Sequence, residues 1–375
     1  MLIKYQSLFA KLQNLNENEL IIQLKVAVSM SEKQKRAIIV DDSLLIRSVI
    51  TKVLNEINYK VVSEANNGLD AIHKIQAYKP IDLLIIDVMM PKMDGLTALT
   101  EIMKTNPTRT IVVSSYDEKY LDIAYRSLEI GALAFIPKNT NFSIFQSELK
   151  TQIKAIEGAK VAKKFHFEPS LNLVALKPDS KRYISKNRHL VIIGASTGGP
   201  NLVHEIISKL RKPFPPVIVI QHLPIGFTDS FSARMNSKTE LQVVVAEEDM
   251  RLNMNTIYIA PGGKHLILKN ELALRISLTE GDRINGVIPS LDPTIMSASH
   301  AYKDQLTIVI LTGMGSDGLS GCRYAKKDNA FIITQDEESS VVYGMPKAIN
   351  DEQLSDYTGN PSNIITLLNQ RLCGM

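Results

Sequence analysis

At residues 81–95 the chain reads Ile81-Asp82-Leu83-Leu84-Ile85-Ile86-Asp87-Val88-Met89-Met90-Pro91-Lys92-Met93-Asp94-Gly95. Its apolar run predicts a buried strand that ends on the carboxylate of Asp87. A second stretch of the same form reads Leu190-Val191-Ile192-Ile193-Gly194-Ala195-Ser196-Thr197-Gly198-Gly199 and presents the hydroxyl of Ser196 instead. The first strand end is suited to accept a phosphoryl group, and the second is suited to attack a carbonyl.

The composition is that of an ordinary globular chain. A length of 375 residues suits two domains, and neither the 45% hydrophobic nor the 22% charged content departs from the usual range. No apolar run approaches the ~20 residues that cross a bilayer, and no secretory signal opens the chain, so we expect no membrane insertion. Two cysteines without metal-type spacing favour the cytoplasm. The net charge of +4 is too small to indicate nucleic-acid binding.

Short apolar runs alternate with amphipathic segments over residues 36–156, which we expect to form the first domain. The predicted strands are residues 37–40, 60–63, 83–86, 110–113 and 132–136. Alternation of this kind implies a parallel sheet with helices on both faces. Five strands and five helices predict a flavodoxin-like domain, in which ligands bind at the carboxyl ends of the strands.

A second alternating region, residues 189–370, predicts a separate α/β domain with a doubly wound parallel sheet. Its strongest apolar runs are residues 190–193, 217–220, 242–245, 256–259 and 307–311. Residues 157–188 are polar and rich in lysine, which indicates a linker. Residues 1–35 fit neither domain: a mistaken upstream start or a disordered extension is the favoured interpretation, and a docking helix is the alternative.

Carboxylates gather at the strand ends of the first domain. Asp41 and Asp42 follow one predicted strand and Asp87 follows another, so all three should meet at one edge of the sheet. Such a cluster repels itself unless a cation enters, and hard oxygen ligands select Mg²⁺. Ser114 and Lys138 end two further strands, where a hydroxyl and an ammonium group can contact a bound phosphoryl group.

Ser196 lies in Gly194-Ala195-Ser196-Thr197-Gly198, which fits the G-x-S-x-G turn that lifts a serine above a sheet. A dinucleotide-binding loop is disfavoured, because it requires glycine at position 196 and an acidic residue after the next strand, where Gln221 and His222 stand. From this motif alone, a serine in an ordinary strand–helix turn is an equally good interpretation.

Two further residues favour a catalytic interpretation. His222 directly follows one predicted strand and Asp317 lies just beyond another, so both should share an edge with Ser196. There a nucleophile, a base and an orienting carboxylate can form a relay. His265 follows a predicted turn and is a second candidate for the base. The order Ser, His, Asp differs from that of α/β-hydrolases, so that fold is not implied.

The first domain resembles the receiver domain of response regulators. The resemblance rests on Asp41-Asp42-Ser43, on residues 87–95, on Ser114-Ser115 and on Pro137-Lys138. It implies that Asp87 is the phosphoacceptor, that Asp41 and Asp42 bind the Mg²⁺ used in phosphorylation together with Asp87, and that Ser114 is the switch hydroxyl, a position where relatives often have Thr. It also implies Phe135 as the switch aromatic residue and a histidine kinase as the partner.

The second domain resembles the chemotaxis protein-glutamate methylesterases. The motifs that carry the resemblance are residues 194–199, Gln221-His222-Leu223-Pro224, Tyr258-Ile259-Ala260-Pro261-Gly262, residues 311–318, Gln335-Asp336-Glu337 and Val342-Tyr343-Gly344-Met345-Pro346. The resemblance implies Ser196 as nucleophile, His222 as general base and Asp317 as its orienting acid. It further implies that Thr197 and Met314 line the site, Met314 through its backbone N–H as an oxyanion donor, and that hydrolysis needs no cofactor.

A receiver followed by this catalytic domain is the family's own architecture, and it implies phosphorylation-activated hydrolysis of glutamate methyl esters, with deamidation of glutamines, on chemoreceptors. One segment departs from the family pattern: Val287-Ile288-Pro289-Ser290 stands where relatives usually have His-Arg-Pro-Ser, which bears on substrate preference. The alternative is a response-regulator scaffold with a non-hydrolytic output domain. A DNA-binding output is disfavoured, because no basic recognition helix is evident.

Overall fold

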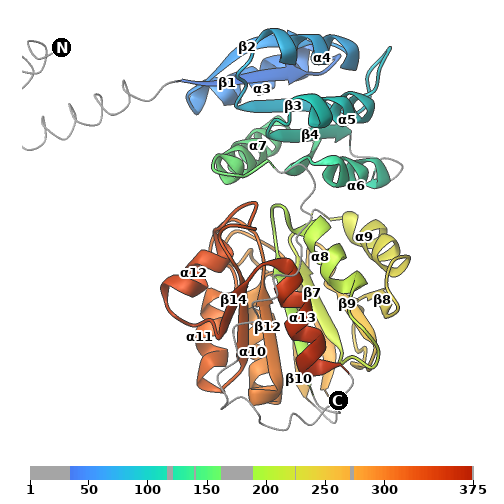
Figure 1. Cartoon of the computed structure of the whole chain (residues 1–375), viewed down its shortest axis with the longest axis vertical. Coiled ribbons are helices and arrows are strands. Elements are labelled where there is room, and N and C mark those ends of the chain that lie inside the picture. Colours follow the sequence, from blue (N-terminus) through green and yellow to red (C-terminus); the bar gives the residue numbers. More distant parts are fainter. Residues whose placement is uncertain are drawn as a thin grey trace, which may run out of the picture.

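The computed structural model describes residues 34–115, 121–138, 141–161, 189–223, 225–270 and 274–373. Two α/β domains follow one another along the chain, and Figure 1 shows the first lying across one end of the second. Nearly all of the expected N-terminal extension and most of the expected linker lie outside the described residues. Among the described residues, no helix is long and apolar enough to cross a membrane.

The first domain contains a five-stranded sheet with β3 as its central strand. The strand order is β2-β1-β3-β4-β5, and every pairing is parallel. The elements are β1 (Lys35–Val40), α3 (Leu44–Glu56), β2 (Tyr59–Ala65), α4 (Gly68–Ala77), β3 (Leu83–Asp87), α5 (Gly95–Thr105), β4 (Thr110–Ser115), α6 (Leu121–Ile130), β5 (Ala134–Lys138) and α7 (Phe142–Ile156). The flavodoxin-like prediction is therefore confirmed, with five strands and five helices in this region.

Local polar residues set where the helices of this domain begin. Ser43, Asn67, Asp94 and Asn141 each lie directly before a helix, and each side chain accepts a hydrogen bond from a backbone N–H of the first turn. Such caps satisfy N–H groups that the helix itself leaves unpaired and typically stabilise by about 1 kcal/mol. Each of these helices therefore starts directly after the loop at the carboxyl end of a strand.

The second domain is a seven-stranded parallel sheet with the order β14-β13-β12-β6-β7-β9-β8. Its elements are β6 (Leu190–Ala195), α8 (Gly199–Ser208), β7 (Val217–Gln221), α9 (Phe227–Asn236), β8 (Gln242–Val245), β9 (Thr256–Ile259), β10 (His265–Asn270), β11 (Leu274–Thr279), α10 (Leu291–Tyr302), the short 3-10 helix η4 (Lys303–Gln305), β12 (Leu306–Ile310), α11 (Leu319–Lys327), β13 (Phe331–Gln335), α12 (Met345–Asp351), β14 (Tyr357–Gly359) and α13 (Pro361–Leu372).

Successive residues of the central strand β6 face opposite sides of this sheet. Val191 and Ile193 join an apolar cluster with residues of α8, α9 and α13, whereas Leu190 and Ile192 join another with residues of α10, α11 and α12. Burial on both faces explains why the strands are continuous apolar runs without polar alternation. The arrangement confirms the predicted doubly wound sheet.

The antiparallel hairpin of β10 and β11 lies outside both parallel sheets. Sequence patterning did not predict it, and the same holds for β13 and β14. Residues 280–290 follow the hairpin and lead from β11 to the first turn of α10.

Helix α6 of the first domain packs against α8 and α9 of the second. Tyr125 of α6 is 1% exposed and belongs to the apolar cluster of the second domain, with its ring 5.4 Å from that of Phe231. Asn201 donates a hydrogen bond of 2.6 Å to the carbonyl of Leu128. Tyr125 thus inserts a buried aromatic ring into the neighbouring domain.

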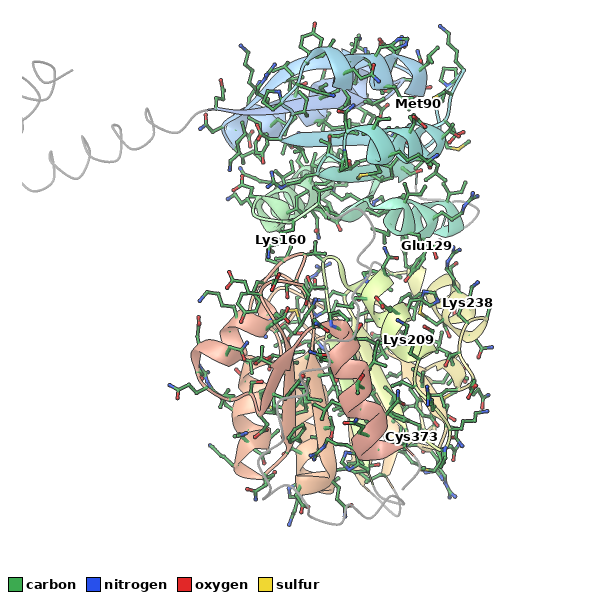
Figure 2. All side chains as sticks on the ribbon, in the orientation of Figure 1. Met90, Glu129, Lys160, Lys209, Lys238 and Cys373 are labelled. Atoms are coloured by element: carbon green, nitrogen blue, oxygen red, sulfur yellow. The ribbon has the colours of Figure 1, made fainter. Side chains whose placement is uncertain are left out.

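Polar contacts surround this apolar anchor. Arg234 forms an ion pair with Glu129, and Lys160 donates hydrogen bonds of 3.0 Å to the carbonyls of Glu337 and Glu338. Figure 2 labels Glu129 and Lys160 at the boundary between the two domains. The contact therefore runs from α6 to the segment that follows α7.

Candidate active site and phosphorylation site

Three carboxylates meet at the carboxyl end of the receiver sheet. Oxygens of Asp41, Asp42 and Asp87 lie within 4.8 Å of one another. Asp41 is fully buried and Asp87 is 3% exposed, whereas Asp42 is exposed. Because hard carboxylate oxygens of this density suit Mg²⁺, the residues present fit the predicted metal.

Lys138 lies between the two buried carboxylates. Its Nζ is 2.6 Å from Asp87 Oδ2 and 2.8 Å from Asp41 Oδ2. Burial raises the pKa of Asp87, and Lys138 offsets this only in part. Burial lowers the pKa of Lys138, but the charges of Asp87 and Asp41 outweigh it and raise that pKa above the ordinary value. The structure thus brings together four predicted residues: Asp41, Asp42, Asp87 and Lys138.

Ser114, at the end of β4, is 1% exposed. Its Oγ has no hydrogen-bond partner within the described part of the chain. A buried hydroxyl without a partner is costly, so an unused donor here is consistent with a ligand that arrives later. The hydroxyl therefore stands as an available donor in the strand next to β3, which ends on Asp87.

Phe135 of β5 contacts the second domain directly. Its ring centroid lies 5.0 Å from that of Phe227, the first residue of α9, with an interplanar angle of 51°. Phe227 follows His222 by only five positions. The predicted switch aromatic therefore packs beside the loop that carries the predicted base.

Ser196 occupies the turn between β6 and α8. Its backbone N–H donates to the carbonyl of Thr312, and its carbonyl accepts from the N–H of Gly199. Gly198 has φ +78°, and a Cβ there would lie 2.6 Å from Val341, so this turn requires glycine. Ser196, the predicted nucleophile, thus lies on a tight turn at the start of a helix, as the motif predicts.

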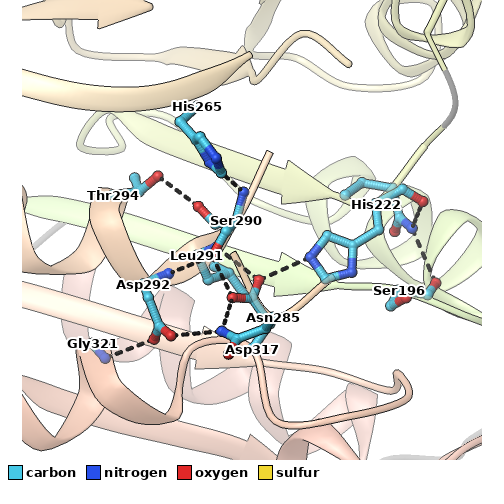
Figure 3. Close-up of polar contacts among 11 residues, drawn as sticks. Ser196, His222, His265, Asn285, Ser290, Leu291, Asp292, Thr294, Asp317 and Gly321 are labelled. Carbon is cyan, nitrogen blue, oxygen red and sulfur yellow. Dashed lines mark hydrogen bonds and ion pairs between the residues drawn. The ribbon is translucent and has the colours of Figure 1, made fainter. Parts of the chain in front are cut away.

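His222 and Asp317 form a direct hydrogen bond. His222 Nε2 lies 2.9 Å from Asp317 Oδ2, and Figure 3 shows the imidazole between Asp317 and Ser196. Nδ1 is buried and has no partner among the residues described. The backbone N–H of His222 also donates to the carbonyl of Ala195, which holds His222 beside the turn that carries Ser196. Nδ1 is therefore the ring nitrogen that remains available for the role of general base predicted for His222.

Asp317 is 2% exposed, and both of its carboxylate oxygens accept hydrogen bonds from neighbouring groups. Besides His222, it accepts hydrogen bonds from Ser290 Oγ at 2.5 Å and from the N–H of Leu291 at 2.8 Å. Burial raises its pKa, but the hydrogen bonds from His222, Leu291 and Ser290 outweigh burial and leave the pKa below the ordinary value. Asp317 is thus held as a carboxylate.

His265, the second candidate for the base, lies elsewhere. Its Nε2 contacts the carbonyl of Asp282 at 3.0 Å, and its Nδ1 accepts from the N–H of Ser290. Both ring nitrogens are occupied by backbone groups, so His265 supports the segment before α10. It is not the partner of Asp317.

Thr197 and Met314 belong to two segments that border Ser196. The carbonyl of Thr197 accepts a hydrogen bond from Thr312 Oγ1, and the side chain of Met314 is 39% exposed. A Cβ on Gly313 would lie 2.7 Å from Ser196 Cβ, so the backbone before Met314 passes directly against Ser196. The placement is consistent with the predicted oxyanion role of Met314.

Sequence reasoning missed two residues that organise the site. Gln221 Nε2 donates to the carbonyl of Ser196 at 3.0 Å and to that of His222 at 3.3 Å, so one amide links the backbones of these two residues. Thr312 accepts from the Ser196 N–H and donates to Thr197. Both residues lie at strand ends, which was the available signal, but amides and hydroxyls are too common there to single out.

The comparisons with known proteins cover both domains. Residues 37–150 match the model of the response regulator receiver domain, and residues 191–368 match that of the CheB methylesterase. A protein-glutamate methylesterase/protein-glutamine glutaminase of Thermotoga maritima is 37% identical over 88% of this chain and 96% of its own length. One of Archaeoglobus fulgidus, with the same name, is 35% identical over 84% of this chain and 91% of its own.

The crystal structure of the CheB methylesterase catalytic domain of Thermotoga maritima is 40% identical, with a TM-score of 0.48, and covers 49% of this chain and 98% of that one. The full-length relatives extend over both domains and are more than 30% identical. The chain belongs to the CheB family of protein-glutamate methylesterases with an N-terminal response-regulator receiver domain.

Proposed function

We propose that this chain hydrolyses glutamate methyl esters and deamidates glutamines on chemoreceptors, under control of phosphorylation at Asp87. The hydrogen bond between His222 and Asp317, beside the turn that carries Ser196, is the observation that supports it most strongly. Release of methanol from methylated receptor membranes tests the activity. The names of the relatives favour hydrolysis over the alternative of a non-hydrolytic scaffold.

The chemistry follows from the three side chains. Ser196 Oγ attacks the ester carbonyl while His222 Nδ1 takes its proton, and Asp317 holds the imidazole and stabilises its positive charge. The protonated His222 then gives that proton to the departing methoxide, which leaves as methanol. Water, activated by His222, cleaves the acyl-enzyme to a carboxylate. A glutamine amide follows the same path and releases ammonia.

The tetrahedral intermediate carries a negative charge on the former carbonyl oxygen. We assign its stabilisation to backbone N–H groups in the region of Thr197 and Met314, because these segments border Ser196 on two sides. Donors placed where the charge develops typically contribute about 3–4 kcal/mol to the transition state. No cofactor enters this sequence of steps.

The receiver residues have separate roles. Asp87 accepts the phosphoryl group, and Asp41, Asp42 and Asp87 hold Mg²⁺. When bound, the metal neutralises charge on the phosphoryl group and on the attacking carboxylate. Lys138 contributes a further positive charge, and Ser114 offers its free hydroxyl to a phosphoryl oxygen. A cytoplasmic histidine kinase of the chemotaxis system is the phosphodonor consistent with this domain.

The contacts between the domains support a mechanism in which phosphorylation at Asp87 controls access to Ser196. The receiver contacts α9 at Phe227 and the segment around Val341, whose side chain lies against Gly198. Both contacts border the Ser196–His222 edge, so the docked receiver restricts access to it. Phosphorylation would draw Ser114 toward the phosphoryl group on Asp87, which Lys138 already contacts, and would displace Phe135. Docking is expected to weaken by ~1–3 kcal/mol, or about 5–150-fold.

Asp87→Asn is expected to abolish activation by a small-molecule phosphodonor and to leave basal methanol release unchanged. The amide keeps the shape of the carboxylate but has no nucleophilic oxygen for phosphoryl transfer. Glu101→Gln, at an exposed position on α5, serves as the charge-matched control and should respond like wild type. A phosphodonor response that persists in Asp87→Asn would place the phosphoacceptor elsewhere.

Tyr125→Ala is expected to raise the basal activity of the unphosphorylated protein by severalfold. The variant removes the ring that α6 buries against Phe231, and loss of such an anchor typically costs more than 1 kcal/mol of docking free energy. Methanol release without phosphodonor measures the effect. Tyr78→Ala, which removes a 40%-exposed ring after α4, is the matched control. Equal basal rates in both variants would argue against inhibition by docking.

A further inference from the structure

We propose that Asn285 is a positioning residue for the esterase reaction, acting on His222 through Asp317; this inference rests on the proposed function. Asn285 lies in the segment between β11 and α10. Its Nδ2 donates to Asp317 Oδ1 at 3.0 Å and to Asp292 Oδ2 at 2.8 Å (Figure 3). One amide group thus supplies a hydrogen to each of two carboxylates.

The backbone places this amide with little freedom. Ile284 and Val287 exchange two backbone hydrogen bonds, of 3.1 and 3.0 Å, across a two-residue turn. The central residues Asn285 and Gly286 have φ values of 54° and 78°. Turns with two left-handed residues favour Asn followed by Gly, because asparagine tolerates this region and glycine enters it without strain. The turn chemistry thus explains why an asparagine fits here.

The two acceptors need a donor between them. Asp292 is 5% exposed, and its Oδ1 accepts from the N–H of Gly321 at 2.7 Å. Burial raises the pKa of Asp292, and the charge of Asp317 adds to this effect. Without the amide, two buried carboxylates would face each other with one fewer shared donor. Asn285 therefore permits both to stay in place.

The geometry also fixes how Asp317 faces the base. Asn285 and Ser290 hold Oδ1, while His222 and the N–H of Leu291 share Oδ2. Loss of the Oδ1 contact frees the carboxylate to rotate away from the imidazole. Partners that orient a catalytic or metal-binding side chain commonly affect activity by about 10–100-fold. We expect the same range here, confined to kcat, because Asn285 acts on the base and not on the bound ester.

Two variants separate positioning from folding, since Gly and Asp both suit the left-handed turn. Asn285→Gly should lower kcat for methanol release from receptor membranes by about 10–100-fold, with KM within about twofold and the melting temperature near that of wild type. Glu280→Gln, in the same segment with an 85%-exposed side chain, should match wild type. Wild-type kcat in Asn285→Gly would overturn the inference.

Asn285→Asp adds a second measurement, the pH dependence of activity. A purely structural role of Asn285 would leave that pH dependence unchanged. The new carboxyl faces Asp292 and Asp317, near the imidazole of His222, the thiol of Cys322 and the guanidinium of Arg283. Carboxylate neighbours raise its pKa, so it loses its donor hydrogen as the pH rises and regains it as the pH falls. Activity relative to wild type should therefore increase from pH 9 to pH 6.

Full wild-type activity of Asn285→Asp at pH 9, where the new carboxyl has lost its donor hydrogen, would contradict the positioning role. Failure of the proposed function is distinguishable, because the wild-type protein would then release no methanol under any of these conditions. The wild-type reaction is therefore run first, and the Asn285 variants are compared with it.

Discussion

Ser196→Ala is expected to lose methanol release by about 10⁴–10⁶-fold, the scale on which removal of a triad nucleophile acts. The Oγ is the only atom removed, and the Cβ that lies close to the Gly313 position is retained. The turn from β6 to α8 should therefore keep its structure. Initial rates on methylated receptor membranes, with thermal unfolding measured in parallel, quantify the loss.

Ser208→Ala provides the matched control for this variant. Ser208 ends α8, and its hydroxyl donates to the carbonyl of Glu205 within the same helix, away from the triad. Its activity should stay within about twofold of wild type, since removal of one such surface hydrogen bond usually costs less than 1 kcal/mol of stability. Substantial turnover by folded Ser196→Ala would remove this serine from the role of nucleophile.

Asp317→Asn is expected to reduce kcat by about 10⁴-fold, as in the serine protease triad. Asp317 is an acceptor for His222, Ser290, Leu291 and Asn285. An amide presents an NH₂ group to some of these donors, so it both loses acceptors and favours the wrong tautomer of His222. The measurement is the single-turnover rate of methanol release, which reports chemistry separately from binding.

Asp328→Asn is a useful comparison, because Asp328 caps the C-terminal end of α11, opposite the end next to Asp317, and accepts a hydrogen bond from Ser299 at 2.7 Å. It should change stability slightly and kcat little. If Asp317→Asn retained more than a tenth of wild-type kcat, Asp317 would be a structural residue and His222 would act without an orienting acid.

The fold was largely predictable because its strands are buried on both faces. Continuous apolar runs such as residues 190–193 and 217–220 become β6 and β7 almost without change of boundary. The β10–β11 hairpin escaped prediction for the complementary reason. Its strands are half-exposed and mix charged residues, such as Lys269 and Arg275, with apolar ones, so no long apolar run marks them.

The candidate site was predictable to the extent that its residues follow strand ends. Asp87, His222 and Asp317 met that condition, and parallel topology brought each to its sheet edge. Asn285 did not meet it, because it lies in a turn after an antiparallel hairpin. Its contact with Asp317 joins residues 32 positions apart. The contact depends on the position of that turn relative to the sheet, which the periodicity of the strands does not predict.

Methanol release from methylated receptor membranes, with and without a phosphodonor, tests phosphorylation-controlled hydrolysis most directly when wild type and Ser196→Ala are compared. Phosphorylation-activated hydrolysis by Ser196 predicts slow release by wild type alone, release faster by roughly 5–150-fold with phosphodonor, and none above background by Ser196→Ala in either condition. Absence of wild-type release, or equal release by the two proteins, would contradict it.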